Sequence, residues 1–113
     1  MATQTRRITT EPMQRGCLSI DAPCMRARWR DREIELTAAE FRVVSLLASR
    51  SGGVSHSTIG AVKSERRGQD NARNVHATIK RIRRAFAAVD PGFTGIETLY
   101  GAGYGWRDTD ERR

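Results

Sequence analysis

The sequence predicts an α+β fold in which a short antiparallel β-meander precedes three helices and a C-terminal β-hairpin. Three observations predict it. Apolar and polar residues alternate between Cys17 and Leu36, a pattern typical of strands with one buried face. A helix-start signal follows at Thr37, and the segment from Ile96 to Trp106 alternates again around a glycine-rich centre. A chain of 113 residues has room for one such domain.

Turn-forming residues at 21–23 and 31–32 divide the first segment into short strands. Its apolar residues at alternating positions are Leu18, Ile20, Met25, Ala27, Trp29, Ile34 and Leu36. We expect these side chains to share the buried face of the meander.

The residues Thr37 and Glu40 form a capping-box pattern, which predicts that a helix begins there. The apolar residues that follow are Phe41, Val43, Val44, Leu46, Leu47 and Ala48. Because they cover most of the helix circumference, this helix is predicted to be buried against two neighbours. Residues 51–53 end it, and Ser55 is a suitable N-cap for a short second helix.

The third helix is predicted from residue 70 or 71 to about Ala88, where an Asp-Pro-Gly turn stops it. Its apolar residues Val75, Ile79, Ile82 and Phe86 are spaced by four, three and four positions and form one stripe that faces the core. The side chains expected on the outward face are Arg73, Ala77, Lys80 and Arg84, with Asn74 and Arg81 on one flank and His76 on the other.

Positive charge is concentrated in the same part of the chain. The whole sequence has 20 Lys and Arg against 13 Asp and Glu, a net charge of +7. Residues 63–84 carry eight basic and two acidic side chains, so +6 of this charge lies in one segment. A localised field attracts a polyanion to one face of a domain, whereas solubilising charge is scattered. Nucleic acid is therefore the first partner to consider.

Other classes of protein have little support. The acidic residues and the two histidines form no acid–base or triad pattern, so we expect no enzyme activity and no cofactor. The spacing of Cys17 and Cys24 fits no metal site, and two reduced thiols packed as small hydrophobic groups are expected, although a cross-strand disulfide is geometrically conceivable. No secretory signal or membrane span is present in the sequence, which predicts a cytoplasmic protein without a membrane partner. The ordered domain is expected at 17–107, between flexible tails at 1–16 and 108–113.

An outward face of this composition suits the major groove of double-stranded DNA. Arginine can bind guanine O6 and N7, asparagine can bind adenine, and a small alanine can contact a thymine methyl group. The predicted base contacts are Asn74, Ala77 and Arg81, and the predicted phosphate contacts are Arg73, Lys80, Arg83 and Arg84. The C-terminal hairpin, with Tyr100 and Tyr104, is suited to lie along the phosphate backbone or an adjacent minor groove.

Three segments together resemble the winged helix-turn-helix DNA-binding domain of OmpR/PhoB-type response regulators of bacterial phosphorelay signal transduction. They are Leu-Thr-Ala-Ala-Glu-Phe-Arg at 36–42, Asn-Val-His-Ala-Thr-Ile-Lys-Arg-Ile-Arg-Arg-Ala-Phe at 74–86 and Ile-Glu-Thr-Leu-Tyr-Gly-Ala-Gly-Tyr at 96–104. The form of residues 96–101 is most similar to the ChvI branch of alphaproteobacterial regulators.

The resemblance implies a four-stranded N-terminal sheet and roles for particular residues. It implies that Arg81 reads a base, that Lys80 and Arg83 contact phosphates, and that Tyr104 touches the backbone from the wing. Thr78, Thr98 and Tyr100 are further predicted contacts with the DNA backbone. The resemblance also implies that loop 64–70 is a candidate contact for RNA polymerase. Members of the family normally carry a receiver domain, for which 113 residues leave no room, so the sequence is expected to be either a stand-alone effector domain or a fragment of a longer regulator. As a free domain it is expected to be a monomer in solution or a weak tandem dimer on DNA.

Three functions are weighed on this basis. The first is a sequence-specific transcriptional regulator. The second is a nucleoid-type protein that binds any duplex without sequence preference, with an affinity set mainly by salt. The third is a protein-interaction module that contacts RNA polymerase or another regulator through residues 64–84.

Overall fold

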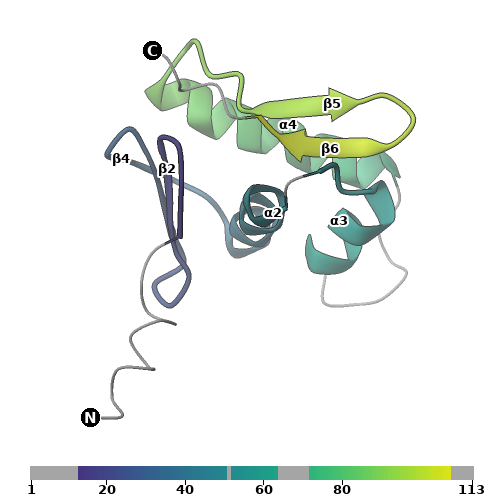
Figure 1. The fold of residues 1–113 in the computed structure, drawn as a ribbon, viewed down its shortest axis with the longest axis horizontal. Coiled ribbons are helices and arrows are strands. Elements are labelled where there is room, and N and C mark those ends of the chain that lie inside the picture. Colours follow the sequence, from purple (N-terminus) through teal and green to yellow (C-terminus); the bar gives the residue numbers. More distant parts are fainter. Residues whose placement is uncertain (1–12, 51, 64–71, 108–113) are drawn as a thin grey trace.

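The computed structural model describes residues 13–50, 52–63 and 72–107 (Figure 1). The N-terminal sheet has four antiparallel strands in the order β1-β2-β3-β4. The strands are β1 (Met13–Arg15), β2 (Leu18–Asp21), β3 (Arg26–Trp29) and β4 (Arg32–Ile34). They are followed by the helices α2 (Ala38–Ser49), α3 (His56–Lys63) and α4 (Ala72–Val89), and by the hairpin strands β5 (Ile96–Leu99) and β6 (Gly103–Trp106). The predicted α+β architecture is confirmed.

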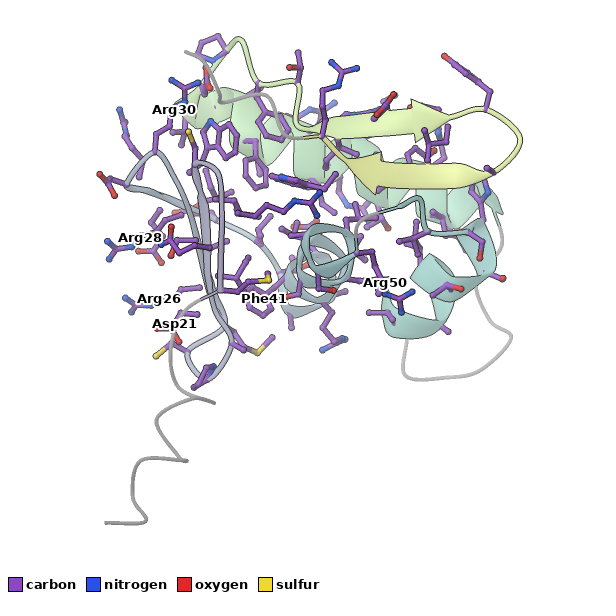
Figure 2. The ribbon with its side chains drawn as sticks, in the orientation of Figure 1. Asp21, Arg26, Arg28, Arg30, Phe41 and Arg50 are labelled. Atoms are coloured by element: carbon purple, nitrogen blue, oxygen red, sulfur yellow. The ribbon has the colours of Figure 1, made fainter. Side chains whose placement is uncertain are left out.

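One face of the sheet packs on the helices, as the alternation predicts. The buried sheet residues are Leu18, Ile20, Ala27, Trp29 and Ile34. Met25 differs from the prediction, since it lies in the β2–β3 turn with a positive φ of 53° and is exposed. In Figure 2, Phe41 lies on the helix side of the sheet, whereas Arg26 and Arg28 point away from the helices on the opposite side.

Strand β1 corrects the predicted limit of the N-terminal tail. Met13 pairs with Ile20 and Arg15 pairs with Leu18, so residues 13–15 belong to the sheet instead of the tail at 1–16. The Nη1 atom of Arg15 also donates hydrogen bonds of 2.7 Å to the carbonyl oxygens of Ala48 and Arg50 at the end of α2. A three-residue strand is too short for an alternating pattern to reveal. The remaining tail residues, 1–12 and 108–113, lie outside the described residues.

Helix α2 lies at the centre of the domain and begins at the predicted capping box. Thr37 Oγ1 accepts a hydrogen bond from Glu40 N (3.1 Å), and Glu40 Oε1 accepts one from Thr37 N (3.0 Å). In Figure 1, α2 is seen almost end-on between the sheet and α3. Its buried apolar residues contact α3, α4 and β6, which confirms the prediction of burial against more than one neighbour.

Helix α4 is fixed to this core by its apolar stripe. Val75, Ile79, Ile82 and Phe86 are all fully buried, as predicted. At the C-terminal end of the helix, the rings of Phe86 and Phe93 stack with centroids 4.4 Å apart. Trp29 of β3 packs edge-on against Phe93 at 5.0 Å, and Trp106 of β6 completes the cluster. This aromatic cluster joins the sheet, α4 and the hairpin.

The hairpin packs against the segment between α2 and α3. Val54 N donates to Tyr104 O (2.7 Å), and Tyr104 N donates to Val54 O (3.0 Å). Gly101, in the turn at the tip, has a φ of +80°, which glycine adopts without strain. Gly103 has a φ of +138°, and a Cβ atom there would overlap the carbonyl group of Val54. The backbones can meet at this point because residue 103 has no side chain.

We expect Gly103→Ala to lower the free energy of unfolding by ~2 kcal/mol or more. The new methyl group would have to displace the backbone at Val54, and alanine at residue 103 would be strained at the positive φ found there. Gly52→Ala is the matched control, since a Cβ there meets no atom and the change should stay within ~0.5 kcal/mol. Urea denaturation measures both. Equal destabilisation by the two variants would contradict this packing.

A second link between the sheet and the end of α4 is electrostatic. Trp29 Nε1 donates to Asp90 Oδ2 at 2.8 Å, and the Arg30 guanidinium lies 3.6 Å from the same oxygen. The hydrogen bond from Trp29 is the main cause of a pKa for Asp90 below its ordinary value of 3.8, and the Gly92 amide and Arg30 lower that pKa further. A lowered pKa means that ionised Asp90 stabilises the fold above about pH 4, and that this contribution is lost as pH falls through the folded-state pKa.

We therefore expect Asp90→Asn to destabilise the domain at pH 7 and to have a smaller effect at an acid pH below the folded-state pKa of Asp90, where the native carboxyl is protonated as well. The measurement is the free energy of unfolding of both proteins at the two pH values. Asp31→Asn removes the same charge from an exposed turn and controls for net charge. If the free energies of unfolding of the wild type and of Asp90→Asn differ by the same amount at both pH values, the role of ionised Asp90 is refuted.

Candidate nucleic-acid interface

The face of α4 opposite the apolar stripe is exposed and cationic. Asn74, Lys80, Arg81 and Arg84 are exposed, and Ala77 between them is half-buried. These five residues were predicted to lie on the outward side, and the structure brings them together there. The side chain of Arg73, a further predicted phosphate contact, lies outside the described residues.

The two flanks of α4 are held by different elements. On one flank, Arg81 Nε lies 3.3 Å from Glu40 Oε2 at the start of α2. On the other flank, Arg83 Nη2 donates hydrogen bonds of 2.9 Å to Ile96 O and to Thr98 Oγ1 in the hairpin. The predicted face of α4 therefore lies between two lateral contacts.

Arg83 is half-buried and clamps α4 to the hairpin. Besides its bonds to Ile96 and Thr98, its guanidinium carbon lies 5.9 Å from the centre of the Tyr104 ring. Arg83 and Thr98 were predicted as phosphate contacts, and the structure shows them bonded to each other. Sequence position alone could not reveal this, because residue 98 approaches residue 83 only through the packing of the hairpin.

Tyr104, which was predicted to contact the DNA backbone, is buried in the structure. Only 2% of its surface is exposed, and its hydroxyl group lies 2.9 Å from Nδ1 of His76. The His56 ring packs edge-on against Tyr104 with centroids 5.4 Å apart. The ring therefore belongs to the core under the hairpin, and His76 links it to the exposed flank of α4.

Thr78, also predicted to contact the DNA backbone, is buried as well. Its exposed fraction is 1%, and its hydroxyl group donates to Asn74 O, one helical turn earlier, at 3.0 Å. Threonine can satisfy its hydroxyl group by bonding a carbonyl oxygen four residues before it, which allows it to be buried in a helix. Tyr100, in contrast, is 93% exposed at the tip of the hairpin, as a contact there requires.

Two residues take part in the site although the sequence indicated no such role. Glu40 was predicted only as a helix cap, yet its second carboxylate oxygen contacts Arg81. His76 was placed on the flank of α4, yet its bond partner Tyr104 is 28 residues away. The capping-box pattern could have indicated a fixed carboxylate at Glu40, but not what lies beside it.

The remaining predictions concern chemistry away from α4. Cys17 and Cys24 are free thiols, and Cys17 packs against the core as predicted, whereas Cys24 is exposed in a turn. Among residues 13–50, 52–63 and 72–107, no three His, Cys, Asp or Glu side chains gather to hold a metal ion. No helix in these ranges has the length and apolar character needed to cross a membrane. Loop 64–70 lies outside the described residues.

Comparison with known proteins identifies the family. Residues 31–106 match the family model described as "Transcriptional regulatory protein, C terminal". The transcriptional regulatory protein BaeR of Escherichia coli O6:H1 (strain CFT073) is 31% identical over 91 residues, which are 79% of this chain and 38% of BaeR. The chain thus spans about two fifths of the length of this relative.

Solved structures share the fold. The DNA-binding domain of CpxR from E. coli has a TM-score of 0.72 at 22% identity, covering 87% of this chain and 98% of that one. The Klebsiella pneumoniae RstA DNA-binding domain in complex with the RstA box has a TM-score of 0.72 at 18% identity, with the same coverage of 87% and 98%. At these identities the likeness shows the fold alone. The family is a class of DNA-binding domain and is not an enzyme class.

The matched segment contains α2, α3, α4 and the hairpin, the elements that build the exposed cationic face. The chain therefore belongs to the family of transcriptional regulatory protein C-terminal domains, the winged-helix DNA-binding domains of OmpR/PhoB-type response regulators.

Proposed function

We propose that this chain regulates transcription by binding a preferred double-stranded DNA sequence, with α4 in the major groove and the hairpin at 96–106 on the adjacent backbone or minor groove. One observation carries the proposal. The apolar stripe of α4 is fully buried, while Asn74, Lys80, Arg81 and Arg84 are exposed on its other side. A helix held in this way can enter the major groove, which is wide enough to admit it, with its hydrogen-bond donors facing the base edges.

The residues on the outward face of α4 divide into two groups by chemistry. Arg81, Asn74 and Ala77 match the groups that distinguish guanine, adenine and thymine in the major groove. Lys80 and Arg84 carry flexible cations suited to phosphates, which supply affinity for any sequence. The exposed ring of Tyr100 is proposed to reach the DNA beyond the groove.

The complex of the RstA domain with the RstA box supports binding by this fold. The contact of loop 64–70 with RNA polymerase, the weak tandem dimer on DNA and the ChvI-like affiliation stay predictions.

The experiment begins with selection of preferred duplexes from a random DNA library. A sequence-specific regulator enriches one motif and binds it more tightly than a scrambled duplex. Enrichment of no motif, with equal affinity for all duplexes, favours the nucleoid-type alternative. No binding to any duplex favours the protein-interaction module.

On the selected duplex, we expect Arg81→Ala to cost ~1–3 kcal/mol of binding free energy and to relax the preference at one base pair. Its effect on the scrambled duplex should be small by comparison. Fluorescence anisotropy with both duplexes provides the measurement. An equal loss on the two duplexes would show that Arg81 contacts only the backbone.

Lys80→Ala should weaken binding to the selected and scrambled duplexes by similar factors, because a phosphate contact carries no sequence information. The slope of log K against log salt should also fall in magnitude by about 1. Titrations at several salt concentrations test this. A loss confined to the selected duplex would instead make Lys80 a base-reading residue.

A further inference from the structure

Glu40 and Arg81 are 41 residues apart in the sequence and touch in the fold. Glu40 Oε2 lies 3.3 Å from Arg81 Nε. The two partners differ in exposure, since the Glu40 side chain is 10% exposed and that of Arg81 is 57% exposed. The carboxylate therefore belongs to the body of the domain, whereas the guanidinium belongs to its surface.

The carboxylate is fixed independently of Arg81. Its other oxygen, Oε1, accepts the hydrogen bond from Thr37 N, and the backbone of Glu40 is held by the Thr37 hydroxyl group. Both belong to the capping box at the start of α2, which packs in the centre of the domain. Of the two partners, Arg81 is thus the one whose conformation the contact restricts.

A second fixed atom lies beside the guanidinium. Arg81 Nη2 is 3.4 Å from Thr78 Oγ1, and that hydroxyl group is itself bonded to Asn74 O. A guanidinium has five N–H donors, so these two contacts leave three for another ligand. Because Nε and Nη2 are both held, the plane of the guanidinium group is fixed in the orientation in which it would meet the edge of a guanine.

An open groove of about 570 Å³ surrounds this contact. Its acidic lining residues are Glu33, Glu35 and Glu40, and Arg81 and Arg84 contribute its cations. If the carboxylates acted only through their charge, each would repel phosphates and weaken binding to every duplex. The contact to Arg81 distinguishes Glu40 from Glu35, which is exposed in the same groove.

We propose that Glu40 is a positioning residue for DNA recognition, because it holds the Arg81 guanidinium in the orientation that reads a base. The inference rests on the proposed function and adds a determinant of specificity outside α4. A long arginine side chain loses rotamer freedom when it binds, and prior orientation reduces that loss. The resulting gain in affinity is confined to a duplex that carries the base that Arg81 reads.

The test compares Glu40→Gln with Glu35→Gln, which removes the same charge from the same groove. The quantity measured is the ratio of affinities for the selected and scrambled duplexes. Glu40→Gln should lower this ratio about three- to tenfold, while affinity for the scrambled duplex stays equal or rises. Glu35→Gln should leave the ratio unchanged. Thermal melts of each variant confirm that it is folded.

The double variant Glu40→Gln/Arg81→Ala distinguishes a failure of this inference about Glu40 from a failure of the proposed role of Arg81. If Glu40 acts through Arg81, Glu40→Gln should no longer change the ratio once Arg81→Ala is present. If Glu40→Gln and Glu35→Gln raise affinity equally for both duplexes, Glu40 acts by charge alone and the inference is overturned. If Arg81→Ala itself leaves the ratio unchanged, the role of Arg81 in the proposed function fails instead.

A measurement on the unaltered chain covers the case in which Glu40→Gln does not fold. NMR relaxation of the arginine Nε–H groups in the free protein should show Arg81 more restricted than Arg84, an exposed arginine of the same helix and groove. Equal mobility of the two side chains would overturn the inference.

Discussion

Burial of one stripe of α4 is the constraint on which the rest of the domain depends. Val75, Ile79, Ile82 and Phe86 fix the rotation of the helix about its axis, and hence which side chains can face a ligand. The aromatic cluster of Trp29, Phe86, Phe93 and Trp106 then fixes its C-terminal end against the sheet and hairpin. The exposed cations of α4 owe their placement to this packing.

The lateral contacts of α4 leave a narrow outward face between them. Glu40 engages Arg81 on the side of α2, and the hairpin engages Arg83 and His76 on the other side. Side chains on the flanks therefore connect elements, whereas Lys80, Arg84 and Ala77 lie between them. A domain built in this way can combine a base-reading arginine held at one flank with flexible phosphate contacts between the flanks.

Regular patterns made most of the fold predictable. The alternation at 18–34, the capping box at 37–40 and the stripe of α4 each depend on nearby residues, and all three are present. Predicted surface positions and the predicted start of the sheet differ from the structure where contacts between segments distant in the sequence determine them. Tyr104 and Thr78 carry polar atoms that predict a surface position, yet each satisfies its hydroxyl group inside the fold. The strand at 13–15 was missed because pairing with its neighbour creates it.

The central claim is that donors on α4 address base edges in the major groove. Replacing single guanines of the selected duplex by 7-deazaguanine tests it most directly, because the substitution removes the N7 acceptor and preserves base pairing. One such replacement should weaken binding by the wild-type chain and have no further effect on the Arg81→Ala variant. Unchanged binding at every replaced guanine would contradict it.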